Sequence, residues 1–390
     1  MKFAKNLPLT DTPSPLYLNG TSIINYTNQY NEPYQLVATD PKKVLITKNQ
    51  TDFNKIKPII NASLESNKLW VAATSYEWGV AQLGLNTAHA HAIFIEYDQF
   101  EFKPAIPYER LSTPLPPLQL APQWTHRQFQ AAVDQAKSAI KEGDIYQINL
   151  IYPSHVLGDI SIESIYDAIF KHQMPPHGAF INTDFCKIAS CSPEEFFYFK
   201  DGNIRSRPIK GTIGRHSDPI KDQLAFEHLK SSKKDFAELT MITDLMRNDL
   251  SMCAKQGSVN TPTLCDIVPF NYVYHLMSTV EAETKPSLTP LEILSQLAPG
   301  GSITGCPKHS ACQMIEMIEA APRHFYTGHI GFMHGTQEAA FNVAIRSCYQ
   351  YPSSPIITHS GCGITIDSIP ELEYQESLDK LRFITDYITQ

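Results

Sequence analysis

The pattern of apolar and polar residues predicts a helix that begins just after residue 125. Thr125 and Gln128 match a capping box, in which side chains satisfy the free backbone N–H groups at a helix start. The residues of the expected apolar face recur at helical spacing, and they are Phe129, Val133, Ala136 and Ile140. Gly143 ends this pattern, so we expect the helix to end there.

A strand is predicted at residues 145–152, directly after this helix. One of its faces is apolar and aromatic, whereas the other carries Gln147 and Asn149 together with Ile145 and Ile151. Amides on a partly buried face need hydrogen-bond partners. The two amides therefore either serve the structure or line a pocket.

The remaining strands and helices do not alternate strictly along the chain. Strand patterns recur at residues 325–332 and 340–351, and in the second of these Asn342, Ala344 and Arg346 share one face. Helical patterns cover about residues 233–255, 289–297, 306–319 and 369–388. This order favours an α+β fold over a doubly wound parallel one.

A proline-rich segment divides the chain into two parts. Between Phe102 and Trp124, prolines stand at positions 104, 107, 114, 116, 117 and 122, and they break any helix or central strand. We therefore expect an N-terminal lobe of residues 1–115 that packs on a core of residues 116–390.

The composition is that of a folded chain. With 390 residues, 42% of them hydrophobic and 18% charged, the chain can bury a large core. A net charge of −8 without a basic stripe argues against nucleic acid as a partner. The N-terminal residues lack a secretion signal and no run of about 18 apolar residues occurs, so we expect a cytoplasmic protein without membrane contact. The 8 cysteines form no CxxC pair, and we expect buried thiols.

Two of the predicted helices carry acidic residues three positions apart. These are Asp235 with Glu238 in the first helix, and Glu373 with Glu376 in the last. Residues three apart share one helix face, and apolar residues continue the first face towards a core. Like charges gathered there cost free energy unless a cation neutralises them, and Mg²⁺ with oxygen ligands is a natural counter-charge. The alternative is a pair of ordinary solvated faces.

Lys210 stands in the segment Pro208-Ile209-Lys210-Gly211-Thr212, which we predict to be a turn between strands. A lysine in a turn is usually solvated. Among apolar neighbours it can instead be partly desolvated and act as a neutral, nucleophilic amine.

Two glycine-rich segments can bring backbone amides close to a ligand. The first is PGGSITGCPK at residues 299–308, with Pro307 at the expected start of a helix. A helix N-terminus suits an anion, although a plain structural turn is the alternative. The second is HSGCGI at residues 359–364, predicted to be a turn ahead of the last helix, with an ordinary loop as its alternative.

Taken together, these segments resemble the chorismate-utilising enzymes, and most closely the large components of aminodeoxychorismate synthases. The resemblance runs from about residue 125 to residue 388. It rests on motifs in one order: GDIYQINL, SPEEFF, RPIKGT, DLMRNDL, HLMSTV, PGGSITGCPK, FYTG, FNVAIRS and PELEYQES. It implies the chorismate-binding fold, a large antiparallel sheet sandwich flanked by helices around a buried site.

The resemblance also implies where metal and substrate bind. Glu238 and Glu376 would bind Mg²⁺, with Asp235 and Glu373 bridged to it by water, and the ring carboxylate of chorismate would complete the metal shell. The groups expected to hold and position the rest of the substrate are Tyr326, Arg346, the amides of Gly361 and Gly363, Lys380, His275 and Thr304.

Two positions separate the branches of this family. Members that form isochorismate or salicylate carry a lysine where this chain has Gln147, and members that form anthranilate carry a small residue where it has Lys210. The resemblance therefore implies 4-amino-4-deoxychorismate as the product, on the route to para-aminobenzoate and folate. Lys210 would attack C2 while Glu194 protonates the leaving C4 hydroxyl. We expect burial and neighbouring acids to raise the pKa of Glu194.

The source of ammonia is expected to be a separate glutamine amidotransferase subunit, because the chain shows no glutaminase-type cysteine turn. Two alternatives stay open: anthranilate synthase component I, and a catalytically silent chorismate-binding subunit. Lys210 and Glu194 speak against the silent subunit. Ser63-Leu64-Glu65-Ser66 matches only part of the tryptophan-pocket motif of relatives, so feedback inhibition by tryptophan has little support.

Overall fold

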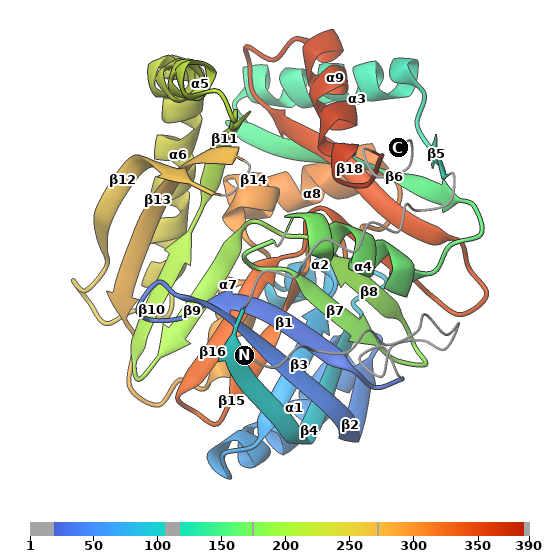
Figure 1. Ribbon diagram of the computed structural model, residues 1–390, viewed down its shortest axis with the longest axis vertical. Helices are drawn as coiled ribbons and strands as arrows, with labels where there is room; N and C mark the ends of the chain where they lie inside the picture. The colour runs from blue at the N-terminus through green and yellow to red at the C-terminus, as the bar shows by residue number, and fades with distance from the viewer. Residues whose placement is uncertain (1–18, 106–117, 174, 271–272, 386–390) are drawn as a thin grey trace, which may run out of the picture.

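A continuous antiparallel ladder runs through the computed structural model, which describes residues 19–105, 118–173, 175–270 and 273–385 (Figure 1). In chain order the strands are β1 (Ser22–Thr27), β2 (Pro33–Thr47), β3 (Leu69–Thr74), β4 (Ala92–Pro104), β5 (Gln119–Pro122), β6 (Gln147–Leu157), β7 (Ala179–Asn182), β8 (Lys187–Ser190), β9 (Glu195–Lys200), β10 (Asn203–Arg207), β11 (Ile209–Gly214), β12 (Asn260–Pro269), β13 (Val273–Glu283), β14 (Gly305–Cys306), β15 (His329–His334), β16 (Glu338–Val343), β17 (Ser347–Gln350) and β18 (Ile356–Ile364).

Hydrogen-bonded neighbours follow the order β12–β13–β10–β9–β16–β15–β3–β4–β2–β1–β7–β8–β17–β18–β6. Strand β11 also pairs with β13, and β5 and β14 pair with β6. The strands of the expected N-terminal lobe thus join the core directly, through the β1–β7 and β3–β15 pairs. Most of the proline-rich connector lies outside the described residues.

Helices cover both outer faces of this folded sheet (Figure 1). They are α1 (Gln50–Glu65), α2 (Tyr76–Gln82), α3 (His126–Glu142), α4 (Ile162–Gln173), α5 (Pro219–Ser231), α6 (Lys233–Ser251), α7 (Pro290–Leu297), α8 (Lys308–Glu319), α9 (Pro370–Lys380) and α10 (Arg382–Thr385), with a 3₁₀ helix η2 (Gly301–Ile303). Helices α3 and α9 contact each other beside β18 and β6, whereas α6 packs on β13, β12 and β11. No helix in the described ranges is long and apolar enough to cross a membrane.

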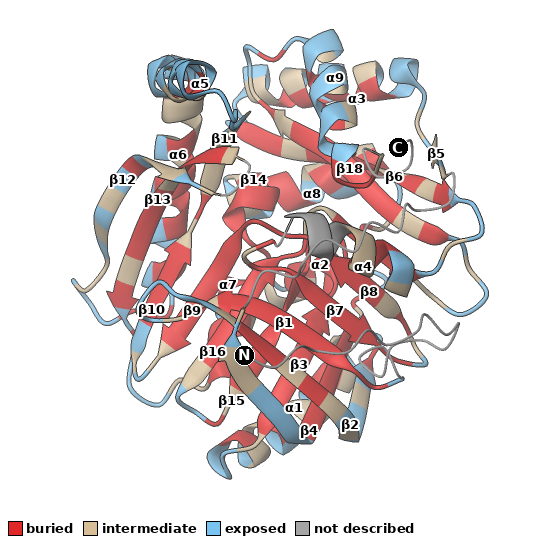
Figure 2. Ribbon diagram, in the orientation of Figure 1, coloured by how far each residue is buried: buried red, intermediate tan, exposed pale blue. Residues whose placement is uncertain are grey.

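Strand β3 shows why the sheet is buried on both faces (Figure 2). Its residues alternate between two apolar clusters, with Trp70 and Ala72 in one and Leu69, Val71 and Ala73 in the other. Successive side chains of a strand point to opposite faces, so a continuous apolar run satisfies both clusters. One cluster lies under the helices and the other fills the interior of the sandwich.

The predicted α+β fold is confirmed. Helix α3 has the expected capping box at Thr125 and Gln128, and Gly143 closes it with a φ of 87°. The helices predicted at 233–255, 289–297 and 306–319 are present with slightly shorter bounds. Within the described residues, the helix predicted at 369–388 is divided into α9 and α10. All eight cysteines lie in the described ranges and are free, seven of them buried.

Four local predictions were wrong. The strand predicted at 325–332 begins only at His329, because residues 325–328 form a turn. Residues 359–364 continue strand β18 and do not form a turn. Lys210 lies on strand β11, because Ile209–Gly214 pairs with β13. The strand predicted at 340–351 breaks into β16 and β17, since Arg346 adopts a left-handed φ of 50° between them.

A buried arginine joins the segments that will form the site. Arg323 is 1% exposed and makes a two-pronged ion pair with Glu319 at the end of α8. Its other N–H groups donate to the carbonyl oxygens of Ile303 (2.8 Å) and Asn149 (2.6 Å). Since each of these carbonyls belongs to a different element, one guanidinium connects η2, β6 and α8.

Replacing this arginine should destabilise the fold strongly. Arg323→Met leaves the buried Glu319 carboxylate without its partner, and we expect a loss of roughly 3 to 5 kcal/mol in the free energy of unfolding. Urea denaturation measures it. Arg247→Met is the matched control, because the Arg247–Asp244 pair is half exposed or more and should contribute below about 1 kcal/mol. Equal losses in the two variants would contradict the structural role of Arg323.

Candidate active site

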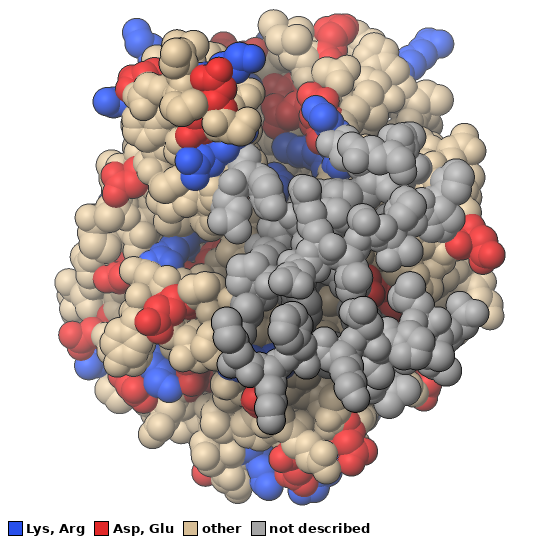
Figure 3. Space-filling model, in the orientation of Figure 1, with Lys and Arg blue, Asp and Glu red and all other residues tan. Residues whose placement is uncertain are grey.

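One cavity of about 2040 Å³ opens among α6, α9, β11 and β18. In Figure 3, acidic and basic side chains gather in the recess between α5 and α9. The predicted site residues that line the cavity are Glu194, Lys210, Asp235, Glu238, His275, Tyr326, Arg346, Gly361, Gly363, Glu373, Glu376 and Lys380. They come from segments far apart in the sequence, and the fold brings them to one cavity.

Lys210 reaches the cavity from a β-bulge. The register between β11 and β13 shifts between Lys210 and Thr212, so the intervening Gly211 has no partner. Gly211 has a φ of +69°, and a Cβ placed there would lie 3.0 Å from both Asp235 Cγ and Leu229 Cδ1. Glycine is therefore needed for backbone conformation and for close packing on α5 and α6.

Glu194 is buried beside two basic side chains of the cavity. Burial raises the pKa of its carboxyl, while Ser302, Lys210 and Arg346 act in the opposite direction. The raised pKa agrees with the sequence-based expectation, but the expected contribution from neighbouring acids is wrong. A carboxyl with a raised pKa is suited to donate a proton near neutral pH.

The four acids of α6 and α9 meet on the cavity wall, where serine hydroxyls hold two of them. Ser232 donates to Asp235 at the start of α6, and Ser368 donates to Glu373 (2.8 Å) ahead of α9. Burial raises the pKa of Glu238, and Glu376 and Asp235 add to this effect. The contributions of Glu376 and Asp235 are the repulsion expected between carboxylates that lie close together.

Lysines from the same two helices lie among these acids. Lys380 Nζ is 2.8 Å from Glu376 Oε1 and donates to the carbonyl of Gly361. Lys234 Nζ lies 3.8 Å from Glu238 Oε1 and 3.9 Å from Glu373 Oε1. Burial opposes the ionisation of Glu376, but Lys380, Lys234 and Lys210 together outweigh it and lower its pKa.

In a second part of the cavity wall, neutral hydrogen-bonding groups accompany Arg346. His275 is 2% exposed, and burial and the charge of Arg346 lower its pKa to about 3, so the ring is neutral. Its Nδ1 lies 2.8 Å from Thr212 Oγ1. The ring of Tyr326 stacks on His359 at 5.0 Å. This wall therefore offers one cation and several uncharged donors and acceptors.

Two predicted residues do not line the cavity. The hydroxyl of Thr304 donates to the carbonyls of Gly300 (2.9 Å) and Gly301 (3.2 Å), so it serves its own loop. Gln147 is 3% exposed, and its Oε1 has no hydrogen-bond partner in the described part of the chain. Its Nε2 lies 3.6 Å from the position of a Cβ on Gly363, so it stands directly beside the wall.

The sequence analysis missed several polar residues of the cavity lining, among them Thr212, Lys234 and Ser302. Thr212 and Ser302 lie within motifs that were recognised, namely RPIKGT and PGGSITGCPK. Lys234 stands four positions before Glu238, a spacing typical of helical ion pairs that would have indicated it.

The sequence and the fold of this chain are similar to those of known proteins. The model of the chorismate binding enzyme family matches residues 29–386. This chain belongs to that family. Aminodeoxychorismate synthase component 1 of Klebsiella aerogenes is 37% identical over 64% of this chain and 55% of its own length. The Escherichia coli protein of that name is 32% identical over 80% of this chain and 69% of its own length. The chain thus spans about half to two thirds of these relatives.

Other members of the family are similar at lower identity. Anthranilate synthase component 1 of Aquifex aeolicus is 31% identical over 66% of this chain and 52% of its own length. Among solved structures, an isochorismate synthase of Bacillus anthracis has a TM-score of 0.78 at 19% identity, covering 95% of this chain and 96% of its own. Anthranilate synthase component I of Streptococcus pneumoniae has a TM-score of 0.73 at 22% identity, covering 99% and 95%. These structures establish the fold.

In this member of the family, Glu238 and Glu376 give the acidic wall two carboxylates, the number with which proteins commonly hold Mg²⁺. Within the described ranges, no three His, Cys, Asp or Glu side chains converge as a ready-made metal site. Mg²⁺ takes only one or two carboxylates, because waters and substrate oxygens complete its shell. Glu238 and Glu376 repel each other on this wall, and a bound cation would remove that repulsion.

The packing of Gly211 against α6 predicts a specific stability difference. Gly202→Ala should cost about 1 to 2 kcal/mol, since Gly202 has a φ of +81° and no atom within 4 Å of an added Cβ. Gly211→Ala carries the same backbone cost and must also displace Asp235 and Leu229, so we expect about 1 kcal/mol more. Urea unfolding of both variants measures the difference. A Gly211→Ala variant as stable as Gly202→Ala would show that α6 yields freely at this point.

Proposed function

We propose that this chain is the chorismate-aminating component of an aminodeoxychorismate synthase that depends on Mg²⁺. The observation that carries the proposal is the place of Lys210, on a bulged strand at the cavity and within electrostatic reach of Glu194, Glu238 and Glu376. An amine in that position can reach the ring of a substrate anchored between the acidic wall and Arg346.

The two walls suit the two carboxylates of chorismate. When bound, Mg²⁺ would supply the positive charge that anchors the ring carboxylate, and Glu238 and Glu376 would hold the ion. Arg346 would pair with the enolpyruvyl carboxylate, helped by the hydroxyl of Tyr326 and the amides of Gly361 and Gly363. Neutral His275 would position the substrate without adding charge.

In the first step, the Nζ of neutral Lys210 forms a bond to C2 of chorismate. The ring double bonds shift, and the C4–O bond breaks while Glu194 gives its proton to the departing oxygen, so that water leaves. Lys210 loses the proton of its new C–N bond to solvent or to the Glu194 carboxylate.

In the second step, ammonia bonds to C4, the double bonds shift back, and the C2–N bond breaks. Lys210 leaves as an amine and recovers its proton, and the enolpyruvyl group stays on the ring. The balance is chorismate plus ammonia to 4-amino-4-deoxychorismate plus water. A separate glutamine amidotransferase subunit would supply the ammonia, and free ammonium at high pH would replace it in vitro.

Replacing the nucleophile should abolish the covalent adduct. Wild-type chain incubated with chorismate and Mg²⁺ should gain the mass of a dehydrated chorismate, and Lys210→Ala should gain none. Intact-protein mass spectrometry measures both. Lys230→Ala is the control, because Lys230 is an exposed lysine of α5 outside the cavity lining.

The product separates this proposal from its nearest alternative. With ammonium added, the expected product keeps the enolpyruvyl group, and no pyruvate is released. Release of pyruvate with a fluorescent product would identify an anthranilate synthase instead. Full turnover by Lys210→Ala would rule out the covalent route.

The raised pKa of Glu194 predicts how adduct formation depends on pH. Only the protonated acid can donate, so the rate should fall as the pH rises through the pKa of Glu194. Burial places this fall closer to neutral pH than for an ordinary glutamate. Glu194→Gln should remove the fall and slow adduct formation by about 10²- to 10⁴-fold. Rapid-quench measurement without ammonia tests both, and an unchanged profile in Glu194→Gln would assign the proton to another group.

A further inference from the structure

Strand β9 carries one residue more than both of its neighbours. On the β10 side, Tyr198 faces Arg205 and Glu195 faces Arg207, so three steps of β9 match two of β10. On the β16 side the register also slips by one residue between Phe197 and Glu195. Both ladders thus place a β-bulge at the start of β9, directly after Glu194. Bulges of this kind turn side chains in a new direction.

Glu194 immediately precedes this bulge, and Glu194 and Glu195 both line the cavity. The Glu194 carboxyl is within electrostatic reach of Lys210 and Arg346, whereas the Glu195 carboxylate is bound by Arg205. The backbone of the bulge, held through Glu195, therefore sets where the Glu194 side chain enters the cavity.

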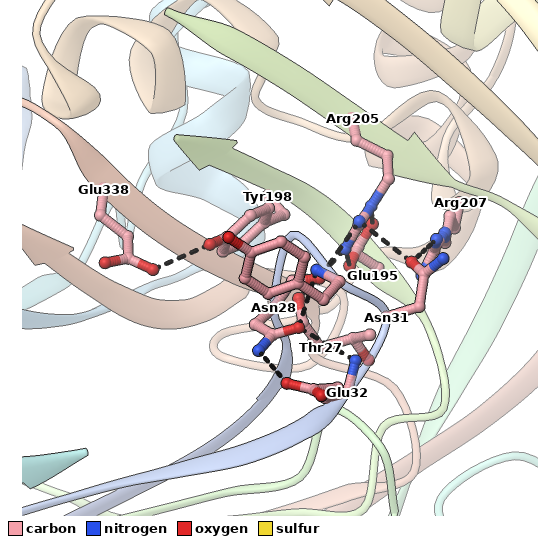
Figure 4. A network of polar contacts seen from close by, with 10 residues as sticks. Thr27, Asn28, Asn31, Glu32, Glu195, Tyr198, Arg205, Arg207 and Glu338 are labelled. Atoms are coloured by element: carbon pink, nitrogen blue, oxygen red, sulfur yellow. Dashed lines mark hydrogen bonds and ion pairs between the residues drawn. The ribbon is translucent and has the colours of Figure 1, made fainter. Parts of the chain in front are cut away.

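A buried ion pair holds the bulge from one side. Arg205 donates from Nε and Nη2 to the two oxygens of Glu195, both at 2.9 Å (Figure 4). The two side chains are 7% and 3% exposed. Two parallel bonds fix both the distance and the plane of the carboxylate, which a single bond would not.

The same guanidinium is itself held by the loop between β1 and β2. Figure 4 shows this loop against Arg205, whose Nη2 donates to the carbonyl of Thr27 (3.0 Å) and whose Nη1 donates to that of Asn28 (3.3 Å) and to Asn31 Oδ1 (3.3 Å). The ring of Tyr198 lies under it at 5.0 Å. Arg205 can therefore not move without breaking contacts to two other segments.

The two neighbouring glutamates are in opposite electrostatic environments. Burial opposes the ionisation of Glu195, but Arg205 outweighs it, and with Arg207 and His177 it lowers the pKa of Glu195. Burial raises the pKa of Glu194. Environments that separate two acids in this way assign the proton to one of them.

We propose that the Glu195–Arg205 pair is a positioning device for the acid Glu194, because it locks the bulge that aims Glu194 at the leaving group. This inference rests on the proposed function. Its consequence is that loss of the pair should slow proton donation while leaving the groups that bind chorismate in place.

A variant that lacks both partners of the pair tests this. Arg205→Met or Glu195→Gln alone removes one partner of a buried pair and should lower stability. The double variant Glu195→Gln with Arg205→Met leaves neither charge of the pair behind, so it should lose less stability than the single variants, and its remaining loss reflects the Arg205 bonds to the β1–β2 loop. We expect it to form the Lys210 adduct about 100-fold more slowly, because a small misplacement of a catalytic group has that effect. Its dissociation constant for chorismate, measured by calorimetry, should stay within about twofold of wild type.

Two further variants complete the experiment. Arg205→Lys keeps the charge and loses the second bond, so its rate should lie between those of the wild type and the double variant. Lys200→Met removes the 2.7 Å pair with Glu338 at the other end of β9 and should leave the rate unchanged. If single variants fold poorly, the double variant and Arg205→Lys still decide the matter.

The outcomes separate the inference from the function it rests on. A double variant that forms the adduct at the wild-type rate, or that slows only in proportion to lost chorismate affinity, overturns the positioning role. If Glu194→Gln is fully active, the role of Glu194 in the proposed function fails and the inference fails with it. If Glu194→Gln is inactive while the double variant is normal, only the inference is wrong.

Discussion

Four carboxylates can share one cavity wall in this protein only because cations lie among them. Lys380 pairs with Glu376, and Lys234 lies between Glu238 and Glu373. Without a counter-charge, two helices that bring acids together at partly buried positions would repel each other. This balance suits the proposed reaction, because the proposed Mg²⁺ and the dianion chorismate would enter together and change the sum of charges little.

The side chains proposed for chemistry lie next to irregularities in an otherwise regular ladder. Lys210 precedes the bulge at Gly211 on β11, and Glu194 precedes the bulge at the start of β9. Arg346 lies in the break between β16 and β17, with a left-handed φ. A regular strand aims side chains only along two directions, so a sheet that must converge several of them on one substrate needs such interruptions.

Elements with strong local signals were predictable from the sequence, and elements defined by long-range pairing were not. The α3 helix has a capping box, an apolar face and a closing Gly143, and all three appear in the structure. By contrast, the glycines at 361 and 363 suggested a turn, yet they stand in a strand. A Cβ at Gly361 would lie 1.9 Å from the carbonyl oxygen of Leu150 on β6, so glycine serves close strand approach there. Local composition cannot distinguish these two uses of glycine.

The sequence by itself determined the fold class, the helix boundaries set by caps, and which acids, lysine and arginine were candidates for the site, because periodicity and motif order are local properties of the chain. The tertiary structure alone decided which candidates meet. In the folded chain, Lys210, Glu194 and the acids of α6 and α9 line one cavity. The hydroxyl of Thr304 instead bonds to a carbonyl of its own loop. Arg323 and Arg205 are buried, and each connects segments that stand behind the cavity wall. Those outcomes depend on register, bulges and charge partners hundreds of residues apart, and no window of sequence contains that information.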